Sequence, residues 1–144
     1  MTNNCFFCDV QNIDDSQKII ENELFYARYD DFPVNPGHCL VFPKNHLVSL
    51  FDLSDDMVLS LYHLLIQTKS IIDENYSPDG FNIGVNEGRA AGRTQDHLHL
   101  QIIPRYNGDV ENPCGGIRNL ITGRGDYSDE MRKRFPEREG YFPE

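Results

Sequence analysis

The chain has 144 residues and a mass of 16.6 kDa, which is enough for one domain to bury a hydrophobic core without disulfides. Lys and Arg number 13 against 23 for Asp and Glu, so the formal net charge is -10 and the surface repels polyanions at long range. This charge excludes general binding to nucleic acid or to an acidic membrane, and it requires local positive charge for any phosphate-bearing substrate. No apolar stretch reaches the roughly 20 residues of a membrane helix. Residues 1–10 lack the pattern of a signal peptide, so we expect a cytoplasmic protein.

The first two cysteines, Cys5 and Cys8, form a Cys-x-x-Cys pair. This spacing allows both thiolates to bind one metal ion, and it is also typical of a redox couple. A thioredoxin-like couple lies between a strand and a helix of a βαβ unit, and no such unit precedes Cys5. A metal site needs two further ligands, and histidine is the donor that we expect. With Cys39 and Cys114 the cysteines number four, a set that does not fit a disulfide framework.

Five short strands are predicted where apolar residues alternate or run together between turn signals. The first two, residues 18–20 and 24–29, form a candidate hairpin, and the third, residues 38–42, ends at Pro43. The last two cover residues 81–86 and 96–103, on either side of a loop at residues 87–93 that is rich in small residues and arginine.

A long helix is predicted between the third and fourth strands, beginning after Ser54, whose hydroxyl suits an N-cap. Asp55 and Asp56 follow in the first turn, where the helix dipole favours carboxylates. The apolar residues recur at intervals of three and four and form one stripe, which consists of Met57, Val58, Leu61, Leu64, Leu65, Ile71 and Ile72. Because the chain shows little strand-helix-strand alternation, these elements predict an α+β fold with an antiparallel sheet of about five strands and one long helix.

The C-terminal part of the chain, residues 107–144, is repeatedly interrupted by glycine and proline. We expect residues 1–106 to form the domain core and residues 107–144 to pack on the same domain or on a dimer partner. A short helix is predicted at Ser128–Phe135, and an extended arm at residues 137–144 carries Tyr141 and Phe142, which need apolar surface.

Polar side chains alternate with apolar ones in the last predicted strand. His97, His99 and Gln101 share one face, while Leu98, Leu100 and Ile102 pack on the other. Imidazole can attack phosphorus, hold a proton near neutral pH or ligate a metal, and the pattern by itself permits all three.

The run His97-Leu98-His99-Leu100-Gln101-Ile102-Ile103 resembles the signature of the histidine-triad (HIT) superfamily, His-φ-His-φ-His-φ-φ with φ apolar. Asp30 with residues 36–46, residues 86–92 and residues 102–105 resemble further segments of the small branch of this family, so the resemblance extends from Cys5 to about Tyr106. It implies a HIT-like fold, a nucleotide or dinucleotide substrate and a homodimer.

The resemblance also implies roles for individual residues. His99 resembles the nucleophile that attacks the α-phosphorus of a nucleotide and forms a nucleotidyl-histidine, which divides the reaction into two easier steps. His38 resembles a supporting histidine of the pocket, and Asp30 a carboxylate that accepts hydrogen bonds from ribose. The remaining nucleotide-binding residues are expected around the phosphates and are Asn86, Gly92, Arg93 and Thr94, together with His99 and Gln101.

The same comparison implies a metal site. Small members of the family that begin with Cys-x-x-Cys are similar to zinc-bearing ones, and the corresponding ligands here are Cys5, Cys8, His46 and His97. A closed Cys2His2 set is a structural zinc site, because catalytic zinc keeps one position open. The alternative is that the two cysteines are small buried residues and that His46 packs in a turn.

Gln101 departs from the family signature at the third histidine position. Its amide donates and accepts hydrogen bonds but cannot titrate, and we expect it among the catalytic residues with His99 and His38. The resemblance implies a hydrolase that cleaves a dinucleoside polyphosphate or a nucleoside phosphoramidate at the α-phosphate. Gln101 favours an alternative, a nucleotidyltransferase or dinucleoside polyphosphate phosphorylase, and a nucleotide-binding protein with little turnover is a third hypothesis.

Two further departures lie beside the signature, at Arg93 and Asp96. Arg93, Arg89 and Arg105 are the arginines that can supply local positive charge to an anionic substrate. The alternative for each arginine is that it neutralises a neighbouring acid at the surface.

Overall fold

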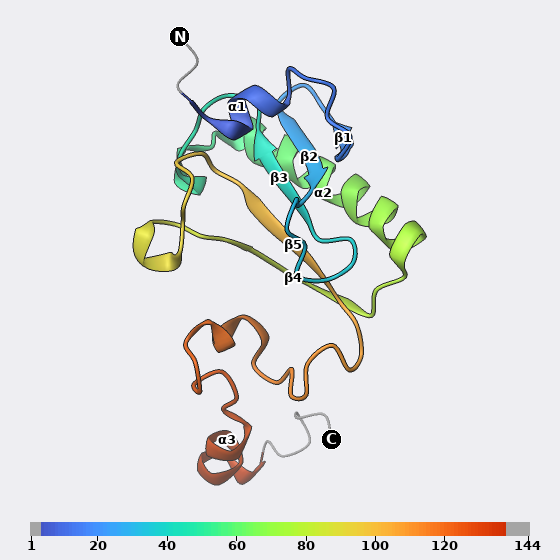
Figure 1. Ribbon diagram of the computed structural model, residues 1–144. Helices are drawn as coiled ribbons and strands as arrows, with labels where there is room; N and C mark the ends of the chain where they lie inside the picture. Colours follow the sequence, from blue (N-terminus) through green and yellow to red (C-terminus); the bar gives the residue numbers. More distant parts are fainter. Residues whose placement is uncertain (1–3, 138–144) are drawn as a thin grey trace. The chain divides into compact units, whose positions relative to one another are not determined.

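The computed structural model describes residues 4–137, and the chain divides into two compact units, Met1–Tyr106 and Asn107–Glu144 (Figure 1). The first unit contains the sheet and the long helix, and it holds every residue predicted for the nucleotide and metal sites.

The strands of the first unit form one five-stranded sheet in the order β1-β2-β3-β5-β4. Their bounds are β1 Lys18–Glu21, β2 Phe25–Tyr29, β3 Cys39–Pro43, β4 Gly80–Val85 and β5 Leu100–Arg105. Every neighbouring pair is antiparallel. The α+β fold with an antiparallel sheet is therefore confirmed.

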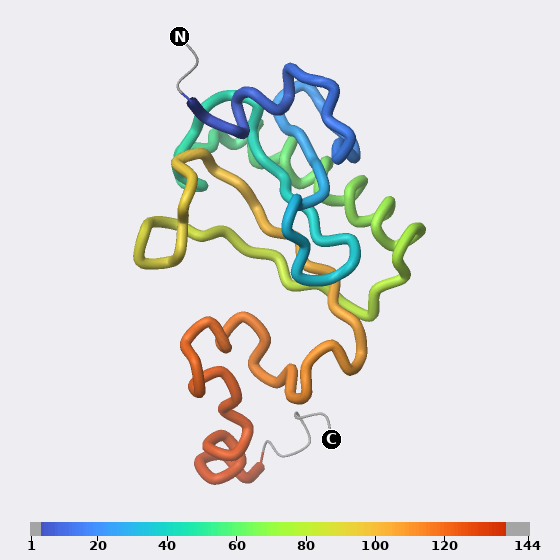
Figure 2. Tube along the Cα trace, in the orientation of Figure 1, coloured from blue at the N-terminus to red at the C-terminus, as the bar shows by residue number. Residues whose placement is uncertain are grey.

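The central strands β2 and β3 are buried on both faces, with two different apolar clusters. Phe25 and Val41 belong to the cluster that the long helix α2, Asp55–Tyr76, covers, together with Leu64 and Ile72. Tyr26, Leu40 and Phe42 point to the opposite face, where they pack against Phe7 and Val10 of the short helix α1, Phe6–Val10. The chain trace shows α1 and α2 on opposite sides of the sheet (Figure 2). Alternate residues of each strand thus serve two cores.

Helix α2 spans Asp55–Tyr76, and the Ser54 hydroxyl accepts a hydrogen bond from the Met57 amide at 3.3 Å, as the N-cap prediction requires. Its fully buried residues are Leu61, Leu64, Thr68 and Ile72. The prediction was wrong for Val58, which is 50 % exposed. One residue turns the helix by about 100°, so Val58 leaves the face on which Met57 contacts the core.

Strand β5 begins at Leu100, and the predicted start at residue 96 was wrong. Pairing with β3 extends only as far as Val41 opposite Leu100. The residues before Leu100 do not pair with β3, because the Leu98 amide donates instead to the carbonyl oxygen of Leu47, at 2.6 Å. Leu98, Leu100 and Ile102 still enter the α2 cluster, so the predicted alternation is confirmed on its apolar side.

The second unit contains the 3-10 helix η3, Gly116–Leu120, and the helix α3, Ser128–Arg134. The short helix predicted from Ser128 is therefore confirmed to within one residue. Asp126 precedes it and accepts hydrogen bonds from the Ser128 amide, the Ser128 hydroxyl and the Asn112 amide group. Most of the predicted arm, residues 138–144, lies outside the described residues. Between residues 4 and 137 no helix has the length and apolar character needed to cross a bilayer.

A buried arginine joins β2 to the loops on either side. Arg28 is 4 % exposed, and its guanidinium donates two hydrogen bonds to Asp15, at 2.9 and 3.0 Å. It also donates two hydrogen bonds to Asp31, both at 3.2 Å. The Asp15 pKa is held below its ordinary value, chiefly by the hydrogen bonds from Arg28 and against the opposing effect of burial.

We predict that Asp15→Asn lowers the free energy of unfolding at pH 7 by about 2 kcal/mol, because it weakens a charge-assisted pair that is buried. Since the folded-state pKa lies below the unfolded value of about 3.9, the contribution is complete above about pH 5 and is lost as the pH falls through the folded-state pKa. Urea denaturation between pH 7 and pH 3 measures both effects. Asp14→Asn at the exposed neighbour is the matched control. Equal losses in the two variants would contradict the prediction.

Candidate functional site

His99 lies immediately before β5, and its ring orientation is fixed by two contacts. Nδ1 lies 2.8 Å from the carbonyl oxygen of His97. Because a carbonyl only accepts, Nδ1 carries the proton and Nε2 of the neutral ring keeps its lone pair. The ring stacks on Phe7 with centroids 4.7 Å apart and an interplanar angle of 22°. The backbone and an aromatic ring therefore hold one unprotonated imidazole nitrogen ready to act as a nucleophile.

His38 and Gln101 form a second fixed pair. The Val34 amide donates to His38 Nδ1 at 3.1 Å, which places the proton of the neutral ring on Nε2. His38 Nε2 then donates to Gln101 Oε1 at 2.6 Å. This bond occupies the amide oxygen and turns the amide nitrogen of Gln101 away from His38, where it can donate to a ligand.

Asp30 lies at the end of β2, beside the same pair. Its Oδ1 accepts a hydrogen bond from the Phe32 amide at 2.7 Å, and its Oδ2 is 3.8 Å from His38 Nε2. The side chain of Asp30 is 17 % exposed, so part of the carboxylate remains accessible to solvent. The structure thus brings Asp30, His38 and Gln101 together, as the sequence suggested.

The loop between β4 and β5 carries the other predicted ligands of a nucleotide. It begins after Val85, the last residue of β4, and ends before Leu100, the first residue of β5, and these two residues pair with each other. A Cβ added to Gly92, which has a φ of 92°, would lie 3.9 Å from the Asn86 side-chain nitrogen. The loop therefore turns back so that Gly92 lies beside Asn86. Arg93 has its Nε 3.2 Å from Asp96 Oδ1, and Thr94 is exposed.

Sequence reasoning missed Glu87, which anchors this loop. The carboxylate of Glu87 accepts a hydrogen bond from the Leu50 amide at 3.1 Å, at the start of the 3-10 helix η1, Leu50–Asp52. The Glu87 pKa is held below its ordinary value, chiefly by a hydrogen bond from the Ser49 side chain and, to a smaller extent, by the hydrogen bond from the Leu50 amide. Phe7 was missed as well. Its position between the two cysteines was visible, but no local pattern indicated that its ring reaches His99.

Four predicted metal ligands form one cluster. The ligand atoms of Cys5, Cys8, His46 and His97 all lie within 4.8 Å of one another. His97 Nδ1 is 3.4 Å from the Cys5 sulfur and 3.5 Å from the Cys8 sulfur, and His46 Nδ1 is 3.3 Å from the Cys8 sulfur. A tetrahedral zinc ion with ordinary bond lengths separates sulfur and nitrogen ligands by about 3.6 Å. The distances in the cluster fit such an ion.

The buried ring of His97 is also oriented for a metal. Its Nε2 donates to the carbonyl oxygen of Pro43 at 2.8 Å, which leaves Nδ1 without a proton and directed at the two sulfurs. A hydrogen bond from the far nitrogen of this kind is the usual support of a metal-binding histidine. The donor set, two sulfurs and two imidazole nitrogens, is the one that zinc prefers.

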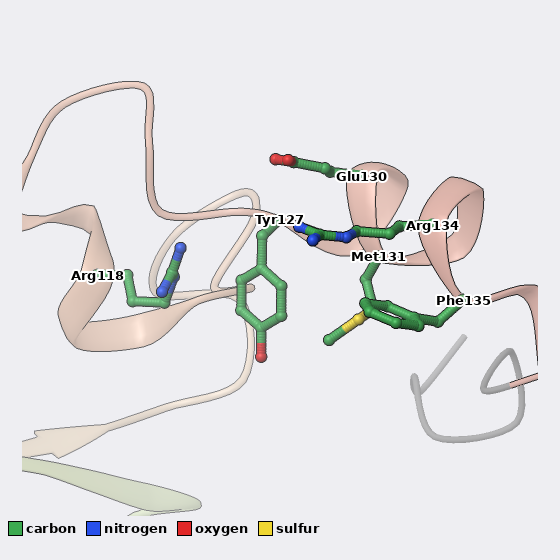
Figure 3. A pocket seen from close by; sticks show the side chains of 6 residues that line it. All are labelled: Arg118, Tyr127, Glu130, Met131, Arg134 and Phe135. Atoms are coloured by element: carbon green, nitrogen blue, oxygen red, sulfur yellow. The ribbon is translucent and has the colours of Figure 1, made fainter.

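The second unit has a hollow of its own, with a volume of about 220 Å³ (Figure 3). Its lining residues come from η3, from the segment between η3 and α3, from α3 and from the residue after α3, and they are Arg118, Tyr127, Glu130, Met131, Arg134 and Phe135. The Arg118 guanidinium lies over the Tyr127 ring, 4.4 Å from its centroid. None of the residues predicted for nucleotide or metal lines this hollow.

Comparison with known proteins agrees with the fold and the cluster. Residues 11–108 match the family model of the HIT domain. A Dictyostelium discoideum protein named bis(5'-adenosyl)-triphosphatase is 34% identical over 130 residues, which cover 90% of this chain and 87% of that protein. A Mycobacterium tuberculosis H37Rv protein named AP-4-A phosphorylase is 32% identical over 107 residues, which cover 72% of this chain and 55% of that protein. The crystal structure of a Zn-bound histidine triad family protein from Mycobacterium smegmatis is 35% identical, with a TM-score of 0.67 and coverage of 76% of this chain and 80% of that one.

The hydrogen bonds predict opposite tautomers for two neutral histidines. We expect a proton on Nδ1 of His99 and on Nε2 of His38 near pH 8, and nitrogen-15 chemical shifts from long-range proton–nitrogen correlation spectra distinguish the two forms. Exposed His63 provides the reference for a ring that solvent surrounds. A proton on Nε2 of His99 would contradict the assignment, because the bond to the His97 carbonyl would then be absent.

Proposed function

Because the chain belongs to the HIT domain family, we propose that it is an enzyme that cleaves a dinucleoside polyphosphate or a nucleoside phosphoramidate at the α-phosphate. The observation that carries the proposal is the hydrogen bond from His99 Nδ1 to the His97 carbonyl, which leaves Nε2 as the nucleophile. The relative named bis(5'-adenosyl)-triphosphatase supports the substrate class.

The first step forms a bond between His99 Nε2 and the α-phosphorus. The bond from phosphorus to the leaving group breaks, and the leaving group takes the electron pair. Positive charge develops on the imidazole, and the carbonyl of His97 stabilises it through the Nδ1 proton. In the second step an oxygen of the acceptor attacks phosphorus, and the electron pair of the nitrogen–phosphorus bond returns to His99 Nε2. Where the acceptor is water, the proton that it loses passes to solvent.

The neighbouring residues bind the nucleotide in this proposal. Asp30 accepts hydrogen bonds from the ribose hydroxyls, and His38 keeps Gln101 in one orientation. Asn86, Gly92 and Thr94 donate to the α-phosphate oxygens, where close approach of the backbone depends on glycine. Arg93 adds positive charge on a protein whose net charge is -10.

A second candidate reaction differs only in its acceptor. An amide cannot take a proton from water, and the short bond from His38 uses the amide oxygen of Gln101. Inorganic phosphate is already ionised and needs no such base. These two observations, with the relative named AP-4-A phosphorylase, favour transfer to phosphate as the alternative to hydrolysis.

His99→Ala is the test of the covalent step. We expect it to lower turnover of diadenosine tetraphosphate by more than about 1,000-fold, because no other group replaces the nucleophile. Acid-quenched wild-type enzyme should carry a nucleotidyl group on His99, which mass spectrometry of peptides detects. His63→Ala, on the exposed face of α2, is the control.

The products with and without inorganic phosphate then identify the acceptor. Water yields AMP and ATP from diadenosine tetraphosphate, whereas phosphate yields ADP and ATP. Full activity of His99→Ala would contradict the mechanism. Tight AMP binding without any nucleotidyl-His99 would favour a binding protein with little turnover instead.

We further propose that a second copy of the chain covers the outer face of α2. Val58, Leu59, Tyr62 and Ile66 are exposed on this helix, and β4 is the last strand in the order of the sheet. A homodimer would bury these apolar side chains and extend the sheet.

We propose zinc as the ion of the Cys2His2 cluster, in a structural role. Cys5, Cys8, His46 and His97 would hold it in a closed tetrahedral set, and the Zn-bound relative supports this choice of metal. When bound, zinc would link α1 to the segment before β5 and supply no chemistry at phosphorus.

Cys8→Ser should lower the zinc content of the purified protein from about one ion per chain to a small fraction, measured by plasma mass spectrometry. The midpoint of thermal unfolding should fall by about 10 °C, because the bound metal stabilises only the folded state. Cys114→Ser, which changes a cysteine of the second unit, is the matched control. Unchanged zinc content in Cys8→Ser would contradict the proposal.

A further inference from the structure

Two arginines and one aspartate form a connected group in the loop between β4 and β5. Arg89 Nη2 is 2.7 Å from Asp96 Oδ2, and Arg93 Nε is 3.2 Å from Asp96 Oδ1. Arg89 also donates from Nη1 to the carbonyl oxygen of Arg93 at 2.9 Å. We name Arg89, Arg93 and Asp96 the arginine clamp, because one carboxylate accepts a hydrogen bond from Arg89 and lies at ion-pair distance from Arg93.

The charge of the clamp is unusual for this protein. Two guanidinium groups share one carboxylate, so the clamp is positive on a chain whose net charge is -10. The side chains of Arg89 and Asp96 are 60% and 52% exposed, whereas that of Arg93 is 16% exposed, so an anion reaches the clamp from the side of Arg89. The other acid of the loop, Glu87, is engaged by the Leu50 amide. A guanidinium pair that is already oriented suits phosphate oxygens, which it can bind in a bidentate manner.

The clamp also lies in the segment that leads to the nucleophile. The loop begins after Val85 and ends before Leu100, which are paired residues of β4 and β5, and His99 is the last residue before Leu100. The 3-10 turn η2, Arg89–Ala91, and the left-handed Gly92 set the direction of Arg93. The Arg93 amide donates to the Gly88 carbonyl at 3.2 Å, which closes the turn. The positive group is therefore part of an ordered loop rather than a pair of independent surface side chains.

We propose that Arg89 and Arg93, aligned by Asp96, bind the phosphates of the leaving group and select polyphosphate substrates over phosphoramidates. This inference rests on the proposed nucleotidyl transfer at His99. When the bond between the α-phosphorus and the bridging oxygen breaks, the departing polyphosphate takes the electron pair and gains negative charge, which the two arginines stabilise. The amine that departs from a phosphoramidate leaves as a neutral molecule after protonation and gains nothing from the clamp.

Asp96 has a positioning role in this proposal. Without its carboxylate, two guanidinium groups close to one another repel, and each is free to pair with other acids of this acidic surface. Asp96→Asn should therefore reduce the preference for polyphosphate less than removal of both arginines does. If Asp96 only competed with substrate, its replacement would raise the preference.

The test compares kcat/KM for diadenosine tetraphosphate with kcat/KM for adenosine 5'-phosphoramidate. In Arg89→Gln and in Arg89→Gln/Arg93→Gln the ratio should fall by about 10-fold and about 100-fold, the effect of losing one and two hydrogen bonds to a charged group. Arg118→Gln, an arginine of the second unit, should leave the ratio unchanged. Equal losses with both substrates would show that the clamp only shapes the loop, and unchanged kcat/KM values for both substrates would show that it does not bind the leaving group. Either result overturns the inference.

A binding measurement separates this inference from the proposed function. Titration calorimetry gives the ratio of the affinities for ATP and AMP, which depends on the phosphates beyond the α-phosphate and needs no turnover. The double variant should lose at least about 10-fold in this ratio. If wild-type protein forms no nucleotidyl-His99, the proposed function fails, and an unchanged affinity ratio still overturns the clamp on its own.

Discussion

His97 holds the site together, because its side chain and its backbone make three different connections. The ring donates from Nε2 to Pro43 at the end of β3, and Nδ1 faces Cys5 and Cys8 at the start of α1. Its carbonyl oxygen accepts a hydrogen bond from Nδ1 of His99. A metal at the cluster would therefore fix the backbone that determines the tautomer of His99, the proposed nucleophile. Only one residue, Leu98 of the core, separates His97 of the metal cluster from His99.

The two apolar clusters explain why this arrangement is rigid. The cluster under α2 contains Leu98 and Leu100, so it fixes the backbone on both sides of His99. The opposite cluster contains Phe7, whose ring packs against Phe42 at 4.8 Å and stacks on His99 at 4.7 Å. His99 is thus held through the core packing of its neighbours Leu98 and Leu100 and by the ring of Phe7, and both clusters depend on the alternation of β2 and β3.

Sequence patterns predicted the fold well because its main signals are local. Alternating apolar residues identified all five strands to within a few residues, and Ser54 marked the start of α2. The start of β5 was missed because the Leu47 carbonyl, distant in sequence, draws the Leu98 amide out of the ladder. The site residues came from a motif and a resemblance, but their tautomers depend on partners such as Val34 and the His97 carbonyl. Glu87 and Phe7 gave no local signal, since each acts through a contact with a distant segment.

The acidic composition has opposite consequences at two arginine sites. Arg28 is buried and shared by two carboxylates, Asp15 and Asp31, so its charge is fully compensated and serves the fold. In the loop before His97 the proportion is reversed, since the single carboxylate of Asp96 lies between Arg89 and Arg93. The guanidinium groups outnumber the carboxylate there, so this loop keeps a residual positive charge that attracts anions. The number of carboxylates around each arginine, rather than the net charge of the chain, therefore determines which of the two sites keeps positive charge for the proposed contact with phosphate.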